Sequence, residues 1–182
     1  MNYENLYRQN LETNLKGRYI TLNDIEPLLL QFNSDNQVQI IGKSVLEKPI
    51  YKYELGTGKI KVLLWSQMHG NESTTTKALF DFLNLLNCNS NIAKELLSKF
   101  SFCCLPMLNP DGAALYTREN ANGVDLNRDA QALSQRESKV LKSIFDALQP
   151  DLCLNMHDQR SIFGIKGPKP ATLSFWHLLQ IF

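Results

Sequence analysis

The sequence has no long apolar run and no excess of charge of either sign. No stretch approaches the ~20 consecutive apolar residues that a membrane-spanning helix needs, and residues 1–10 lack the basic and then apolar pattern of a secretory signal. With 19 lysines and arginines against 18 acids, the formal net charge is +1, which provides no overall field for nucleic acid or an anionic membrane. We therefore expect neither as a partner. We expect a cytoplasmic location for the chain as written, and secretion only if its N-terminus is incomplete.

Cysteine is also scarce, and its four positions show no Cys-x-x-C spacing: Cys88, Cys103, Cys104 and Cys153. The adjacent pair at 103 and 104 would face opposite sides of a strand. Because three of the four lie in apolar runs, we expect buried free thiols, without a disulfide or a second metal site. The length of 182 residues suits one domain with a single core.

Histidine occurs only at His69, His157 and His177, and the first two each end an apolar run. Glu72 follows His69 by three residues. Taken alone, this histidine and this acid could equally be a helix cap and a partner of the helix dipole. Hydrolytic zinc sites use three ligands of the His and Asp/Glu type and leave a fourth position for water. The addition of His157 at the end of another strand therefore favours a single metal site formed by His69, Glu72 and His157.

The first third of the chain predicts a polar lead-in, a helix and two strands. Residues 1–20 are weakly patterned and are expected to be irregular, so that residues 1–35 form a lead-in with one helix. Asn23 or Asp24 is expected to cap that helix, with Pro27 in its first turn. Its apolar face comprises Ile25, Leu28, Leu29 and Phe32. Two short strands are expected within residues 37–55.

Apolar residues at helical spacing predict three further helices. The first follows Glu72, with Leu79, Phe82, Leu83 and Leu86 on its apolar face, and a shorter one spans about residues 92–100. The third is expected to open with a capping box formed by Ser134 and Glu137 and to stop before Pro150.

Three apolar strands, at 61–66, 101–107 and 151–156, alternate with these helices. This order predicts an α/β fold, a three-layer sandwich with a largely parallel or mixed central sheet. In such sheets ligands bind beyond the carboxyl ends of the strands. Each of the three strands is followed by polar residues: His69 with Glu72, Asn109 with Asp111, and His157. We therefore expect these segments to converge on one edge of the sheet.

Four motifs within about residues 60–165 occur in a recognisable order. They are His69-Gly70-Asn71-Glu72, then Asn109-Pro110-Asp111-Gly112, then Arg118 followed by Asn120-Ala121-Asn122-Gly123-Val124-Asp125-Leu126-Asn127-Arg128, and finally His157. Together they resemble the zinc carboxypeptidases of the carboxypeptidase A family. For Asn109 to Gly112 we expect only a turn that shapes the floor of the pocket.

The resemblance implies a role for each matching residue. One zinc ion would be held by His69, Glu72 and His157. Arg118 matches the arginine that stabilises the oxyanion, where negative charge develops in the transition state. Asn127 and Arg128 match the pair that binds the terminal carboxylate of the substrate. Asp125 matches the acid that orients the first zinc histidine through its other ring nitrogen.

The sequence departs from the family after the third zinc ligand. Family members carry a tyrosine and then a glutamate there, and the glutamate is the general base. In this sequence no tyrosine follows Tyr116, no glutamate follows Glu137, and residues 172–182 form an unusually apolar tail. We therefore expect residues 1–182 to be the N-terminal part of a single zinc carboxypeptidase-like domain, incomplete at the C-terminus, with impaired activity.

The expected function is that of a zinc-dependent metallocarboxypeptidase, which removes C-terminal residues with a metal-activated water. Its partner would be a peptide or small amide substrate with a free terminal carboxylate. One alternative is a zinc-dependent N-acyl amino acid deacylase of the aspartoacylase or succinylglutamate desuccinylase type, which shares the first motif and an Asp-Leu-Asn-Arg segment. The Asn109–Gly112 turn and Arg118 favour a peptide substrate. A second alternative is a non-catalytic protein that only binds zinc or a carboxylate.

Overall fold

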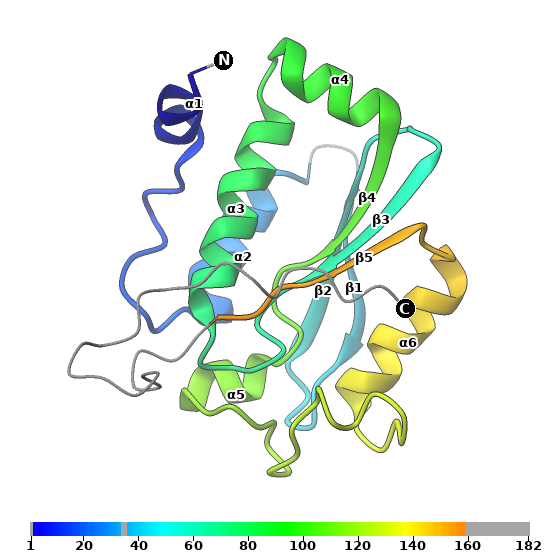
Figure 1. Cartoon of the computed structure of the whole chain (residues 1–182). Coiled ribbons are helices and arrows are strands. Elements are labelled where there is room, and N and C mark those ends of the chain that lie inside the picture. Colours follow the sequence, from blue (N-terminus) through cyan, green and yellow to red (C-terminus); the bar gives the residue numbers. More distant parts are fainter. Residues whose placement is uncertain (1, 34–35, 159–182) are drawn as a thin grey trace, which may run out of the picture.

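The computed structural model of the chain describes residues 2–33 and 36–158 (Figure 1). The helices are α1 (Tyr3–Asn10), α2 (Leu22–Gln31), α3 (Ser73–Asn87), α4 (Asn91–Lys99), α5 (Pro110–Leu115) and α6 (Arg136–Leu148). The strands are β1 (Val38–Lys43), β2 (Pro49–Leu55), β3 (Ile60–Trp65), β4 (Phe100–Leu105) and β5 (Leu152–Asn155). The apolar tail expected at 172–182 lies outside the described residues.

The strands form one mixed sheet in the order β1-β2-β4-β3-β5. β3 lies between β4 and β5 and pairs parallel with both. β2 pairs antiparallel with β1 and with β4. Parallel pairing places the carboxyl ends of β3, β4 and β5 at the same edge, as the sequence predicted. Within the part of the chain that the structure describes, β5 is the edge strand next to β3.

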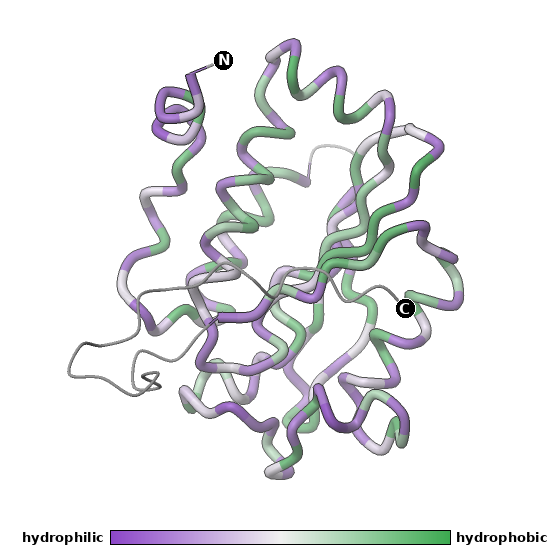
Figure 2. Tube along the Cα trace, in the orientation of Figure 1, coloured by the Kyte–Doolittle hydropathy of each residue, from purple (hydrophilic) through white to green (hydrophobic). Residues whose placement is uncertain are grey.

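Helices cover both faces of the sheet, which confirms the three-layer sandwich. α2 and α3 lie on one face and α6 lies on the other (Figure 1). On β3, Val62 and Leu64 enter the core beneath α2 and α3, whereas Leu63 and Trp65 enter the core beneath α6. Successive residues of a strand point to opposite faces, so a strand covered on both sides must be apolar throughout. Figure 2 shows this continuous apolar colour along the central strands.

The N-terminal region differs from the sequence prediction in two respects. The lead-in is not entirely irregular, because Tyr3–Asn10 form α1, which buries none of its residues. Tyr3, Leu6 and Tyr7 do recur at helical spacing, but three such residues in a short polar segment are a weak signal that the prediction passed over. α2 begins at Leu22, with Thr21 as its N-cap in a capping box with Asp24. Pro27 therefore lies in the second turn, not the first.

The start of α6 also differs from the prediction. Its N-cap is Gln135, so Ser134 and Glu137 do not form a capping box. Ser134 instead donates from its hydroxyl to Asp129 over 2.6 Å. Glu137 is fully buried and accepts a hydrogen bond from the backbone N–H of Val45 over 3.2 Å. Ser134 therefore pairs with an acid five residues before it, and Glu137 with a residue 92 positions away, contacts that the spacing of a capping box does not predict.

Two further predictions agree in part with the described residues, because Asn109–Gly112 begins a helix and Cys153 is only half-buried. Asn109 caps α5, because its Oδ1 accepts from the backbone N–H of Gly112 over 2.9 Å, and Asp111 accepts from the backbone N–H of Leu46 over 2.9 Å. The Asn109–Gly112 segment, predicted as a turn, is thus the capped start of α5. All four cysteines are free, with Cys103 and Cys104 buried. Among the described helices, none has the length and apolar character required to cross a bilayer.

Candidate metal centre

The loop between β3 and α3 presents His69 and Glu72. It turns sharply at Gln67, whose φ is 48°, and the buried amide of Gln67 holds the turn by donating to the carbonyl of Gly70 over 2.7 Å. A Cβ atom on Gly70 would lie 1.9 Å from the backbone of Gly112, so no side chain fits there. The loop therefore packs closely against α5, with His69 1% and Glu72 5% exposed.

His157 reaches the same place from the far end of the chain. It follows β5 by two residues, and β5 is fixed beside β3 by the parallel pairing of Asn155 with Trp65. The backbone N–H of Met156 continues this pairing by donating to the carbonyl of Trp65 over 3.0 Å. The loops that follow two neighbouring parallel strands therefore meet at one edge of the sheet.

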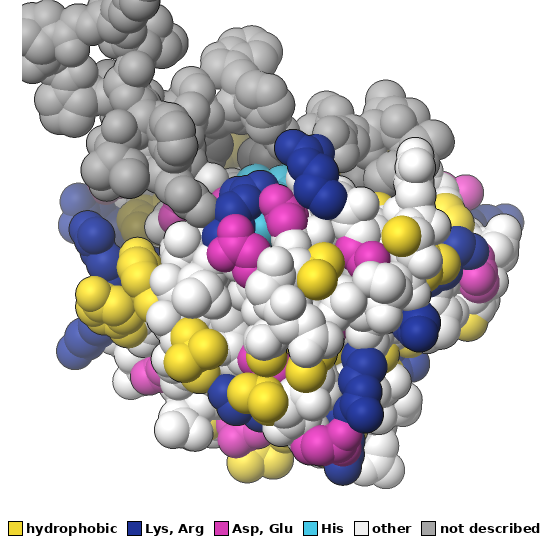
Figure 3. Space-filling view, turned by 90° about the horizontal axis from the view of Figure 1, so that it is seen from below, with side chains coloured by type: hydrophobic (Ala, Val, Ile, Leu, Met, Phe, Trp, Pro, Cys, Tyr) yellow, Lys and Arg dark blue, Asp and Glu magenta, His cyan; other side chains and the backbone are white. Residues whose placement is uncertain are grey.

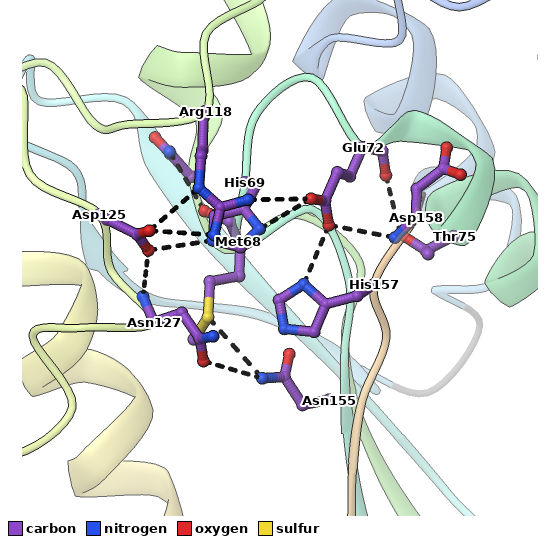
Figure 4. Close-up of polar contacts among 11 residues, drawn as sticks. Met68, His69, Glu72, Thr75, Arg118, Asp125, Asn127, Asn155, His157 and Asp158 are labelled. Atoms are coloured by element: carbon purple, nitrogen blue, oxygen red, sulfur yellow. Dashed lines mark hydrogen bonds and ion pairs between the residues drawn. The ribbon is translucent and has the colours of Figure 1, made fainter. Parts of the chain in front are cut away.

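The three predicted ligands surround one point (Figure 4). Nδ1 of His69 lies 2.9 Å from Oε1 of Glu72, and Nδ1 of His157 lies 2.9 Å from Oε2 of the same carboxylate. The two imidazole rings are 4.8 Å apart between centroids. One donor atom from each of the three residues can be chosen so that all lie within 4.8 Å of one another.

The charges at this point suit a cation. Burial opposes ionisation of Glu72, but hydrogen bonds from His157 and His69 outweigh it and lower the pKa of the carboxyl to about 2. Both oxygens of this carboxylate therefore accept only. A ring nitrogen that faces each oxygen at 2.9 Å must either carry a proton or share a metal ion with it. Two imidazoles and one carboxylate are the ligand set of His₂Glu zinc sites.

Asp125 lies on the other side of the His69 ring. Its Oδ1 is 3.0 Å from Nε2 of His69, and its Oδ2 accepts from Nε of Arg118 over 3.0 Å. Burial opposes ionisation of Asp125, but the hydrogen bonds from His69 and Arg118 hold the pKa of its carboxyl below the usual value. An ionised Asp125 can only accept, so Nε2 of His69 donates to it; with a metal ion bound, the Nδ1 lone pair of His69 would face that ion beside Glu72.

Arg118 lies between the two acids of the site. Besides its contact with Asp125, its Nη1 donates to Oε1 of Glu72 over 3.4 Å. The guanidinium side chain is 27% exposed, so one side remains open to solvent. Figure 3 shows this face of the molecule, where a histidine side chain is visible among basic and acidic groups. A positive group thus borders the ligand set at an accessible position.

Asn127 and Arg128 lie at the edge of the same site. The backbone N–H of Asn127 donates to Oδ1 of Asp125 over 2.9 Å, which ties the pair to the acid beside His69. Arg128 is exposed, and its side chain makes no hydrogen bond or ion pair with any residue in the described ranges. The structure therefore brings together all seven residues singled out by the sequence, while their roles stay predictions.

Two asparagines near the site were missed in the sequence. Asn155 donates to Oδ1 of Asn127 over 3.5 Å; its position two residues before His157 on a predicted strand could have placed it on the same face. Asn120 is 4% exposed and lies between Arg118 and Asp125 in the chain. The sequence analysis included it in a motif without giving it a role, and no local pattern distinguishes a buried asparagine from an exposed one.

Comparison with protein families gives a match to zinc carboxypeptidases (peptidase M14) over residues 26–150. Carboxypeptidase 2 of Trichophyton tonsurans is 32% identical over 116 residues, which cover 64% of this chain and 20% of that protein. Carboxypeptidase E of Caenorhabditis elegans is 37% identical over 113 residues, which cover 49% of this chain and 24% of that protein. The chain thus spans about a fifth of the length of the first of these curated relatives.

Solved structures show the same fold. A metallo-carboxypeptidase from Burkholderia cenocepacia superposes with a TM-score of 0.68 at 24% identity, covering 75% of this chain and 40% of that chain. A metallo-carboxypeptidase from Pseudomonas aeruginosa, solved in complex with (2-guanidinoethylmercapto)succinic acid, gives a TM-score of 0.65 at 23% identity, covering 75% and 39%. At these identities the likeness concerns the fold.

Proposed function

The chain belongs to the zinc carboxypeptidase family, and on that premise we propose that it forms the zinc-binding part of a metallocarboxypeptidase acting on the C-terminal ends of peptides. One observation carries the proposal. The two Nδ1 atoms of His69 and His157 each lie 2.9 Å from a different oxygen of Glu72, at the edge of the sheet where ligands bind in α/β folds.

Zinc is the metal that the family uses, and the donor set fits it. His69, Glu72 and His157 would hold the ion with two nitrogens and one carboxylate, which leaves a position for water. When bound, the metal supplies a Lewis acid that polarises a carbonyl and makes water more acidic. The protein itself would keep His69 in one tautomer through Asp125 and exclude solvent from Glu72 by burial.

Arg118 is proposed to stabilise negative charge on the substrate. Its guanidinium contacts Glu72 and Asp125 and retains an exposed side. A fixed positive group at the position where an oxyanion develops is worth more than the same group in water, because the surrounding protein is of low dielectric. The two acids hold the guanidinium in place before any substrate binds.

Selectivity for chain ends is proposed to come from Asn127 and Arg128. A guanidinium offers two parallel N–H groups that match a carboxylate, and the Arg128 side chain is exposed without a partner among the described residues. A peptide bond in the middle of a chain brings no carboxylate to this position. Only the last peptide bond would then be placed next to the metal.

We propose that hydrolysis by these 182 residues alone is slow. The sequence as given has no glutamate after Glu137 and no tyrosine after Tyr116, where the family supplies a general base. A positioned general base contributes about 10²–10⁴-fold in rate. Zinc binding needs only the three ligands that are present. We therefore expect this polypeptide to bind zinc and yet to hydrolyse peptides slowly.

The test measures zinc content and hydrolysis on the same purified protein. We expect about one zinc per chain, and slow release of the last residue from an N-blocked dipeptide with a free carboxylate. Release should stop with a chelator, return with zinc, and be absent from the dipeptide amide and in His157→Ala. Failure to take up zinc would refute the proposal.

The two alternatives predict different results in this assay. Faster hydrolysis of an N-acetyl amino acid than of the dipeptide would indicate the N-acyl amino acid deacylase. Stoichiometric zinc without any turnover, on either substrate, would indicate a protein that only binds zinc or a carboxylate. The Asn109–Gly112 segment, which donates to the carbonyl of Met68 beside His69, and Arg118, which donates to Asp125, favour the peptidase.

A further inference from the structure

Asn120 contacts none of the three proposed ligands, yet it is the centre of the turn that connects Arg118 to Asp125. We infer that Asn120 is a positioning residue for the metal centre: its buried amide fixes the turn whose two ends carry the arginine and the acid beside His69. The inference rests on the proposed zinc site. It assigns a role to a residue that makes no contact with metal or substrate.

The amide of Asn120 uses its full hydrogen-bonding capacity. Its Nδ2 donates to Oε1 of Gln135 over 2.9 Å and to Oε2 of Glu137 over 3.2 Å. Its Oδ1 accepts from the backbone N–H groups of Asn122 and Val124, both over 3.1 Å. An amide has two donor hydrogens and two acceptor lone pairs. The two ends of the side chain therefore cannot be exchanged.

The donor end of Asn120 is attached to a rigid element. Glu137 lies in the first turn of α6 and is completely buried; its other oxygen accepts from the backbone N–H of Val45 in the β1–β2 connection. Gln135, the N-cap of α6, is 8% exposed and also accepts from Nδ2 of Asn122 over 2.8 Å. The turn is thus fixed both to a helix and to the sheet.

The acceptor end of Asn120 closes the turn itself. The backbone N–H of Asn120 donates to the carbonyl of Val124 over 3.0 Å, and that of Gly123 donates to the carbonyl of Asn120 over 2.9 Å. Gly123 has a φ of +70°, which a residue without Cβ adopts readily. The closed turn brings Arg118 within 3.0 Å of Asp125, and Asp125 is 3.0 Å from Nε2 of His69.

Replacing the amide of Asn120 should therefore lower the affinity of the site for zinc. In Asn120→Asp the new oxygen would face the oxygens of Gln135 and Glu137, which repel it. The turn would shift, and with it the acid that orients His69. Partners of metal-binding histidines affect metal affinity by about 10–100-fold when they are changed. Because Asn120 acts one step further away, we expect a loss of zinc affinity on the order of tenfold.

The experiment measures zinc affinity by competition with a chromophoric chelator in the full chain. Asn120→Asp should bind zinc on the order of tenfold more weakly than wild type. Combining it with Glu137→Gln should restore much of the affinity, because the new amide can donate to the new carboxylate. In an Asp125→Asn background the Asn120→Asp change should add little, because both changes act through one contact.

A matched control is Asn87→Ala. Asn87 is an exposed asparagine that accepts from the Tyr53 hydroxyl over 2.8 Å and lies at the end of α3 far from Glu72. We expect this variant to lose stability without losing zinc affinity. The inference is overturned if folded Asn120→Asp binds zinc within twofold of wild type, or if its effect and that of Asp125→Asn simply add. Wild-type zinc binding without hydrolysis would count against the proposed function alone.

Discussion

Nε2 of His69 lies 3.0 Å from Oδ1 of Asp125, on the side of the ring opposite to Glu72. The acid thereby determines which nitrogen of His69 is free to bind a metal ion. Asp125 occurs 56 positions after His69, so only the fold creates this contact. Four predictions follow from this relationship and its surroundings.

Asp125→Asn should weaken zinc binding. The substituted amide carries no charge to hold the Nε2 hydrogen of His69, and changes of this kind cost about 10–100-fold in metal affinity. The measurement is a chelator competition at neutral pH. Asp129→Asn is the control, because Asp129 is a buried acid of the same loop that contacts Ser134 and Gln135. Equal affinity in the Asp125 variant and wild type would refute the role of this acid.

His157→Ala should reduce bound zinc from about one ion per chain to a small fraction. The variant removes a nitrogen donor that faces Glu72 at 2.9 Å and leaves two ligands, fewer than the three of hydrolytic sites. Metal content after dialysis measures the loss. His177→Ala removes the only histidine without a proposed role and should retain the metal. Equal zinc in both variants would contradict the assigned ligand set.

Arg128→Ala should remove the preference for a free carboxylate. Wild type, loaded with zinc, is expected to bind a peptide acid at least about tenfold more tightly than the same peptide amide, since hydrogen bonds to charged groups contribute about 1.5–3 kcal/mol. Titration calorimetry on both peptides reports the ratio. Arg136→Ala serves as control, because that arginine is exposed and pairs with Glu47 on the surface. A ratio unchanged by Arg128→Ala would exclude this arginine from the carboxylate site.

Acid should destabilise the protein partly through Asp129. Burial opposes ionisation of this acid, but hydrogen bonds from Ser134 and Gln135 outweigh it and lower its pKa to about 2. A depressed pKa stabilises the fold above the ordinary value of about 4, and this stabilisation is lost as the pH falls toward 2. Between pH 6 and pH 3 the free energy of unfolding should fall about 1 kcal/mol more in wild type than in Asp129→Asn.

The measurement for this prediction is urea unfolding with a chelator present. Glu72 also has a lowered pKa, but it is present in both proteins, so the difference between them isolates Asp129. Identical pH dependence in wild type and variant would show that the hydrogen bonds to Asp129 do not depend on its charge.

Much of the fold could be predicted because its strands and main helices have strong apolar patterns. The strand at 61–66 has no alternation, and the structure explains this by placing β3 beneath helices on both faces. The sequence could not show that β2 pairs with β4 and not with β3. That choice depends on contacts between residues far apart in the chain, and the two strands have similar apolar patterns.

The candidate site also has a part that the sequence predicted and a part that it could not predict. His69 and His157 each end an apolar strand, so their convergence followed from the rule for parallel sheets. The contacts of Ser134, Glu137 and Asn120 could not be foreseen. Glu137 and Asn120 are buried, Ser134 is exposed, and each contacts a partner at least five residues away that short-range spacing does not predict.

The proposed metal ligands follow two different strands, which has a consequence for how the protein unfolds. Glu72 and His157 are 85 positions apart, and β5, which precedes His157, is only four residues long and half-buried throughout. An ion bound between them would cross-link these two segments and so close a long loop of the chain. Its release should let β5 separate from β3 first, so that chelation would destabilise this part of the sheet as well as remove the metal.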